Sequence, residues 1–267
     1  MKQSTNYLDG DVIRQVLNLT AILAAFGINV LANVAPFNGL TIGEISNTLF
    51  RNVLITPANY AFAIWGVIYL GLIAFGVYQV RPEQRQNPSL RRMGYLLVLA
   101  SLAQIAWVFF FQYRLFTLSL VAMLAILLPL IGSYLRLGIG YERVSRVEKW
   151  FVHIPLSIYL AWISVATIVN VALTLYNLGW NGWGISAEVW SAIALIAGAA
   201  IAATVGIQRA DVAFVLVIVW AFVAIAVRQA NIPLIAVTAG GLAIALILLL
   251  LFNVLRHRNS RFKPNDE

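Results

Sequence analysis

The feature that most restricts what this chain can fold into is a series of apolar segments long enough to cross a lipid bilayer. A transmembrane helix needs about 20 mostly apolar residues, and residues 53–80, 95–111 and 151–175 approach or exceed that length. Charged residues make up 10% of the chain, against about 25% in a soluble domain. Because backbone groups in lipid must be hydrogen-bonded within their own segment, the sequence predicts an all-α integral membrane protein.

We predict about eight transmembrane helices, with ends that are uncertain by a few residues. Their ranges are 12–34, 57–80, 94–112, 117–135, 151–175, 188–207, 212–228 and 233–255.

The basic residues between these spans predict the orientation of the chain. If the N-terminus is cytoplasmic, fifteen of the 18 Lys and Arg residues fall on the cytoplasmic side, as the positive-inside rule requires. The three on the other side are Arg51, Arg114 and Arg228. We therefore expect a multi-pass protein with both termini in the cytoplasm, and the net charge of +8 needs no nucleic-acid partner. A bacterial plasma membrane is the default location, and a photosynthetic membrane is the alternative.

Polar residues within the spans are mostly amides and hydroxyls. No carboxylate falls in the middle of a predicted span, which argues against ion-coupled transport, and Arg209 is close enough in sequence to pair with Asp211. Gln104 and Asn170 are expected either to join helices by hydrogen bonds or to line a ligand cavity. A stripe of small residues every fourth position predicts close helix packing, within the chain or against another protomer. The stripe is Ala194, Gly198, Ala202 and Gly206.

The sequence excludes several kinds of catalytic chemistry. It has no cysteine, and therefore no disulfide or thiol nucleophile. No hydrolase or kinase motif occurs, and the two histidines, His153 and His257, have no partner at metal-ligand spacing. We predict no catalytic residue, no metal site and no required cofactor.

Tryptophan is the informative residue type. Trp150, Trp180, Trp183 and Trp190 fall at predicted helix ends, where tryptophan is typical of the membrane interface. Trp65, Trp107 and Trp162 fall within apolar spans, where an indole N–H needs a partner. These three could form the walls of a site for a flat aromatic ligand, or pack in the core.

The segments around these tryptophans resemble the TspO/MBR family, which comprises the tryptophan-rich sensory proteins and the mitochondrial translocator protein, or peripheral benzodiazepine receptor. Pro57 is followed by Trp65 and Tyr69, as in the second helix of that family. The third-helix pattern has an amide three residues before a tryptophan, here Gln104 and Trp107. The fifth-helix pattern is matched by Tyr159, Trp162 and Asn170. Asn59 stands where the family often has tryptophan, and several prolines of the family are replaced.

The resemblance implies a TspO-like five-helix unit over residues 1–181, with a pocket closed by the loop at about 35–56. Residues 182–255 are then a three-helix extension, and 256–267 a basic cytoplasmic tail. The expected ligand is a tetrapyrrole such as a porphyrin, or another flat apolar molecule. The sequence leaves open whether the protein forms a homodimer. The ligand-binding residues that we predict are Asn59, Trp65, Tyr69, Gln104, Trp107, Tyr159, Trp162 and Asn170.

Three functions are compatible with these features. The first is a sensory or translocator-like protein that binds the tetrapyrrole in its helix bundle. The second is a transporter or permease for a small apolar solute, although no inverted repeat supports it. The third is an enzyme that promotes light-dependent porphyrin breakdown, which we do not expect because no acid, base or metal site accompanies the tryptophans.

Overall fold

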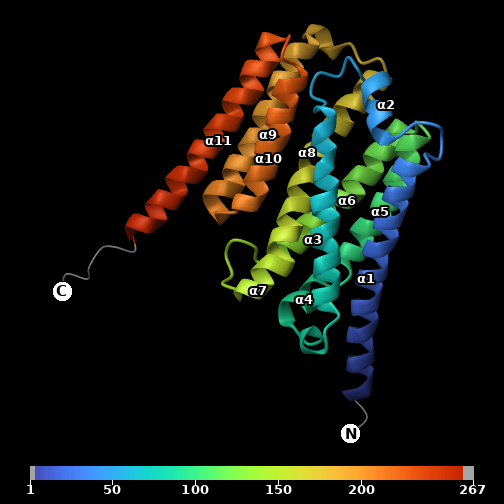
Figure 1. Ribbon diagram of the computed structural model, residues 1–267, viewed down its shortest axis with the longest axis vertical. Helices are drawn as coiled ribbons and strands as arrows, with labels where there is room; N and C mark the ends of the chain where they lie inside the picture. Colours follow the sequence, from blue (N-terminus) through green and yellow to red (C-terminus); the bar gives the residue numbers. More distant parts are fainter. Residues whose placement is uncertain (1–3, 261–267) are drawn as a thin grey trace.

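The structure is a computed structural model that describes the backbone of residues 4–260 and the side chains of residues 10–253. This part of the chain is helical and contains no strand (Figure 1). Its long helices are α1 (Ser4–Val34), α3 (Ile64–Gln79), α5 (Leu96–Gln112), α6 (Phe116–Arg136), α8 (Ile154–Asn177), α9 (Ala187–Arg209), α10 (Val212–Arg228) and α11 (Pro233–Ser260). Short helices lie between them: α2 (Ile42–Thr48), α4 (Pro88–Met93) and α7 (Arg146–Glu148), with 3-10 turns at Asn59–Ala63, Pro82–Gln84 and Gly182–Gly184 and a π-helical turn at Lys149–His153.

The prediction of an all-α membrane protein is confirmed. Six of the described helical segments are long and apolar enough to cross a membrane, and α5 and α10 are shorter apolar helices. Each predicted span coincides with one long helix, although α1 begins at Ser4 rather than near residue 12. The side chains of the predicted basic tail, residues 256–267, lie outside the part of the chain that the structure describes.

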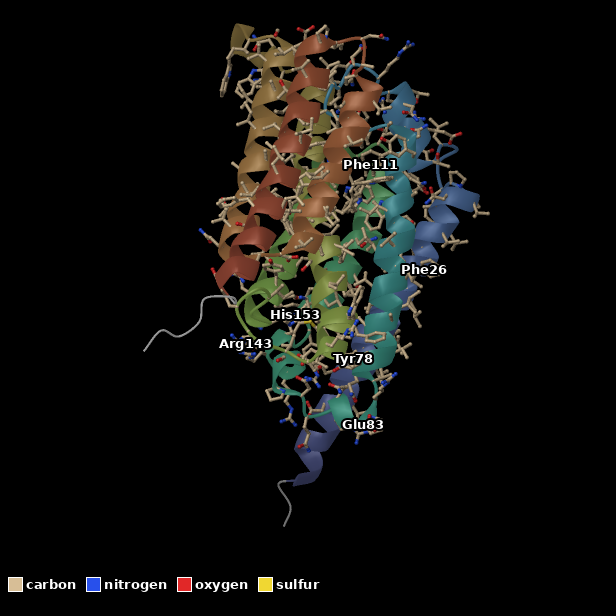
Figure 2. All side chains as sticks on the ribbon, turned by 60° about the vertical axis from the view of Figure 1, so that its left-hand side comes forward. Phe26, Tyr78, Glu83, Phe111, Arg143 and His153 are labelled. Atoms are coloured by element: carbon tan, nitrogen blue, oxygen red, sulfur yellow. The ribbon has the colours of Figure 1, made fainter. Side chains whose placement is uncertain are left out.

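The bundle has two distinct ends, which we call the α2 end and the α4 end. Helix α2 and the α8–α9 connection lie together at the upper end of Figure 1, whereas α4 and α7 lie toward the opposite end. In Figure 2, Phe111 lies in the half of the bundle nearer the α2 end, and Tyr78, Glu83 and Arg143 lie near the α4 end.

Helices α1, α3, α5, α6 and α8 pack together as one group. Hydrogen bonds between polar side chains and backbone carbonyls also join neighbouring helices of this group. The amide of Gln79 on α3 donates to the Gln15 carbonyl of α1 at 2.7 Å, and the Gln15 amide donates back to the Gln79 carbonyl. Both amides are buried, so each bond satisfies a polar group that lipid could not hydrate.

The last three helices attach to this group mainly through α10, which packs against α8; α9 and α11 pack against α10, and α9 makes a smaller contact with α8. The small-residue stripe of α9 is used here. A Cβ atom added at Gly198 would lie 3.3 Å from Phe222 of α10 and 3.6 Å from Ile168 of α8. The stripe therefore packs within the chain, which resolves the alternative that the sequence left open.

The predicted ion pair between Arg209 and Asp211 is wrong, because both side chains are engaged elsewhere. Asp211 caps α10 by accepting from the Phe214 amide at 3.1 Å, and it accepts from the hydroxyls of Tyr134 (2.8 Å) and Ser157 (2.6 Å). It thereby joins α6, α8 and α10. Arg209 lies over the Tyr134 and Tyr141 rings and donates to a loop carbonyl, that of Ile139.

Candidate functional site

The tryptophans that the sequence placed within spans surround one cavity. The cavity has a volume of about 60 Å³ and lies between α3, α5 and α8, beneath α2. Trp65, Trp107 and Trp162 each line it from a different helix. The other lining residues are mostly apolar: Ile42, Ser46, Pro57, Phe62, Phe111, Met123, Val165, Ala166, Val169, Asn170 and Leu173. We call this the tryptophan cavity.

Aromatic contacts set the orientation of its walls. The ring of Trp107 stacks on Phe111 with centroids 5.1 Å apart, and Phe62 meets Trp162 edge-on at 6.2 Å. Trp107 and Trp162 are only 7% and 3% exposed, whereas Trp65 is half-buried. The walls are therefore close together, and a large flat ligand would have to move side chains or α2 to enter.

Asn170 lines the cavity and also anchors one of its walls. Its Oδ1 accepts from the indole N–H of Trp107 at 2.8 Å, and its Nδ2 donates to the Ser119 hydroxyl at 3.1 Å. The Ser119 hydroxyl in turn donates to the Phe116 carbonyl at 2.7 Å. The network joins α5, α6 and α8, so the amide of Asn170 orients Trp107 as well as facing the cavity.

Gln104 forms a second network beside the cavity. Its Oε1 accepts from the Tyr159 hydroxyl and its Nε2 donates to the Tyr69 hydroxyl. Tyr69 then donates to the Ala25 carbonyl at 3.3 Å. This chain joins α8, α5, α3 and α1. These three side chains support the tryptophan cavity without lining it, although the ring of Tyr69 stacks on Trp65 at 5.6 Å.

Asn59 lies away from the cavity. It is exposed in the 3-10 turn before α3, and its Oδ1 accepts from the Asn47 amide at 2.6 Å. Of the eight predicted residues, Trp65, Trp107, Trp162 and Asn170 line the cavity.

Sequence reasoning missed lining residues that helical spacing could have found. Phe62 precedes Trp65 by three positions and Phe111 follows Trp107 by four, and such pairs share one face of a helical segment. Ser46 and Ile42 belong to α2, and no periodicity in the sequence places that short helix over the cavity.

Helix α2 forms the cover of the tryptophan cavity. It begins with a capping box in which the Glu44 amide donates to the Thr41 hydroxyl and the Thr41 amide donates to the Glu44 carboxylate. The bonds from Thr41 lower the pKa of Glu44 below its ordinary value. Ile42 and Ser46 face the cavity from this helix.

Arg228, at the end of α10, fastens this cover to the bundle. Its guanidinium donates to Asn47 Oδ1 at 2.8 Å, to the Pro57 carbonyl at 3.1 Å and to the Ser46 carbonyl at 3.4 Å. Ser46 and Pro57 both line the cavity. No carboxylate among the described residues pairs with Arg228, so its positive charge is not neutralised by the protein.

Some polar groups of the cavity are free to meet a ligand. Within the described part of the chain, the indole N–H groups of Trp65 and Trp162 and the hydroxyl of Ser46 have no hydrogen-bond partner. The cavity thus combines aromatic walls with a few unpaired donors, which is the usual composition of a small-molecule site.

Comparison with known proteins gives one result. Neither a curated protein nor a solved structure matches the chain. A family model described as TSPO-like protein matches residues 15–252. The match extends from α1 into α11 and includes the last three helices, and it supports the resemblance carried by the three tryptophan segments. The chain therefore belongs to the TSPO-like protein family.

Proposed function

We propose that this membrane protein binds a tetrapyrrole, or another flat and largely apolar molecule, in the tryptophan cavity and acts as a TspO-type sensory or translocator-like protein. The observation that carries the proposal is that Trp65, Trp107 and Trp162, from three helices, meet around one cavity. The cavity as it stands has a volume of only about 60 Å³, so we propose that side chains or α2 move when the ligand enters.

The polar groups favour a ligand with acceptor groups at its edge, as a porphyrin has in its carboxylates. The free indole N–H groups of Trp65 and Trp162 can donate to such an acceptor. Arg228 lies behind Ser46 and Pro57 at the cover, and a guanidinium without a protein carboxylate suits an anionic substituent. We propose binding without a catalytic step and without a required cofactor.

The experiment is a titration of the purified protein in lipid nanodiscs with protoporphyrin, followed by tryptophan fluorescence. We expect saturable quenching with one site, and affinities at least about tenfold weaker in Trp107→Phe and Trp162→Phe. Trp150→Phe is the matched control, because Trp150 is 58% exposed and does not line the cavity. Quenching that never saturates, or that is equally weakened in the control, would refute the proposal.

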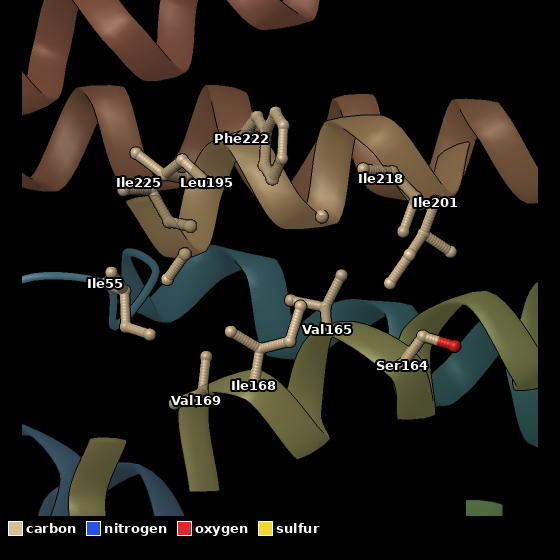
Figure 3. Close-up of a pocket in the computed structure, with 12 residues that line it drawn as sticks. Ile55, Ser164, Val165, Ile168, Val169, Leu195, Ile201, Ile218, Phe222 and Ile225 are labelled. Atoms are coloured by element: carbon tan, nitrogen blue, oxygen red, sulfur yellow. The ribbon is translucent and has the colours of Figure 1, made fainter. Parts of the chain in front are cut away.

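Transport of the same ligand is the second candidate. It is favoured by a small apolar cavity between α8 and the pair α9 and α10 (Figure 3), because Val165 and Val169 of α8 line both this cavity and the tryptophan cavity. Proteoliposomes loaded with the porphyrin distinguish the two functions. A transporter moves it across the bilayer at a rate that Trp162→Phe lowers, whereas a sensor binds it without net movement.

A further inference from the structure

Helix α10 belongs to the last three helices, yet one of its faces contacts the chain that covers the tryptophan cavity. Trp220, Ala224 and Arg228 follow one another at intervals of four residues, so they share that face of the helix. They meet residues 57–61, the segment that leads from the cover into α3. None of these three residues lines the tryptophan cavity, and the proposed function does not use Trp220 or Ala224.

Two hydrogen bonds and one ring contact join α10 to the middle of this segment. The Trp220 indole N–H donates to the Ala61 carbonyl at 3.2 Å, and the Ala58 amide donates to the Ala224 carbonyl at 3.1 Å. The Tyr60 ring meets the Trp220 ring edge-on, with centroids 5.2 Å apart. Segment 57–61 therefore lies along α10 and does not touch it at one point alone.

The segment that α10 holds is continuous with walls of the tryptophan cavity. Pro57 lines the cavity at one end of the segment, and Phe62 lines it just beyond the other end. Arg228 bonds to the carbonyl of Pro57 and to that of Ser46, a lining residue of α2. Because the cavity has a volume of only about 60 Å³, a flat ligand has to displace part of its walls, and displacement of the cover has to break contacts with α10.

We infer that α10 is the latch of the tryptophan cavity: its face at Trp220, Ala224 and Arg228 holds the cover closed, and release of segment 57–61 from that face admits the ligand. The inference rests on the proposed function for the ligand that enters. It gives the last three helices a part in ligand entry, because α10 packs against both α9 and α11. Trp220 acts as a positioning residue, since it holds the cover without lining the cavity.

The variant Trp220→Phe tests the latch, because it removes the indole N–H and keeps an aromatic ring against Tyr60. Hydrogen exchange is measured on the ligand-free protein in lipid nanodiscs. The amides of Ala58 and Ala61 should exchange at least threefold faster in the variant, as expected for the loss of one hydrogen bond between helical segments. Trp150→Phe is the matched control, because Trp150 is 58% exposed and lies next to α7, at the α4 end (Figure 1).

Binding kinetics distinguish a latch from a residue that touches the ligand. In Trp220→Phe, the rate constants for protoporphyrin entry and release, measured by stopped-flow fluorescence, should each rise at least threefold and leave the dissociation constant within twofold. Loss of a ligand contact would instead raise the release rate alone. Unchanged exchange at Ala58 and Ala61, or faster exchange with unchanged entry, would overturn the latch. If the unaltered protein does not bind protoporphyrin, the proposed function fails, and the exchange experiment still decides whether α10 holds the cover.

A reversible crosslink tests the same latch in the opposite direction. The chain has no cysteine, and Tyr60 and Trp220 are 42% and 38% exposed, so the double variant Tyr60→Cys with Trp220→Cys can be joined by a short bis-methanethiosulfonate. Crosslinking should slow protoporphyrin entry at least tenfold relative to the same protein before treatment, and reduction should restore the rate. Each single variant treated with the same reagent is the control. An unchanged entry rate in the crosslinked protein would overturn the latch, even if Trp220→Phe does not fold.

Discussion

Replacement of Gln104 by leucine tests whether the buried hydrogen-bond network beside the tryptophan cavity stabilises the bundle. The change replaces the amide with an apolar side chain of similar size on α5 and removes both bonds that join Tyr159 and Tyr69 through Gln104. Tyr159 is 0% exposed and Tyr69 is 4% exposed, so water cannot replace the lost partner at either hydroxyl.

The expected magnitude follows from these contacts. An interhelical hydrogen bond in a membrane protein contributes about 0.6 to 1.7 kcal/mol, and a buried polar group left without a partner costs about 1–3 kcal/mol. Tyr69 keeps the Ala25 carbonyl as acceptor, so the penalty falls mainly on Tyr159. We expect Gln104→Leu to lower the free energy of unfolding by about 2–3 kcal/mol.

The assay is reversible unfolding in mixed detergent micelles, followed by circular dichroism. The double variant Gln104→Leu with Tyr159→Phe removes the orphaned hydroxyl and should recover about 1 kcal/mol relative to Gln104→Leu alone. A loss below about 0.5 kcal/mol in the single variant, or a double variant whose loss equals the sum of the two singles, would show that the network does not act as described.

Three further predictions concern the ends of the bundle. Asp211→Ala removes the cap of α10 and the acceptor of two hydroxyls, and should lower the free energy of unfolding by about 2–4 kcal/mol, measured as above. Arg228→Gln should speed hydrogen exchange in residues 42–48 relative to the rest of the bundle, because α2 loses the guanidinium that fastens it; unchanged exchange would exclude that role. The bond from Arg92 lowers the pKa of Glu142 below its ordinary value. The stabilisation from this ion pair is therefore fully present above the pKa that Glu142 has in the unfolded chain, and it is lost as pH falls through the lower pKa of Glu142 in the folded protein. When the free energy of unfolding is measured against pH, Glu142→Gln should lose less of it at acidic pH than the unaltered protein.

The helices were predictable because their signal is local. An apolar run of sufficient length identifies a span whatever its neighbours are, and the end of α10 was predicted at Arg228, where the structure has it. The meeting of Trp65, Trp107 and Trp162 was predictable only through the family resemblance, since apolar periodicity does not give the rotation of three helices about a common cavity.

The features that were missed depend on contacts between helices distant in sequence. The amide of Gln104 could have faced a ligand or other helices, and only the registers of α3 and α8 assign it to two tyrosine hydroxyls. Asp211 was close in sequence to Arg209, yet hydroxyls of α6 and α8 reach it instead. The large groove between α8 and α9 likewise exists only once α9 is placed against α8.

The central claim is that the tryptophan cavity is the ligand site, and the most direct measurement fills that cavity. Ala166 lines it from α8, so Ala166→Phe should occupy the space between the tryptophan walls. Binding of protoporphyrin is measured by its visible absorption, with Ala197→Phe as a control that has the same substitution on a lipid-facing position. The account predicts one saturable site in the unaltered protein and the control, and its loss in Ala166→Phe; equal binding by all three proteins would contradict it.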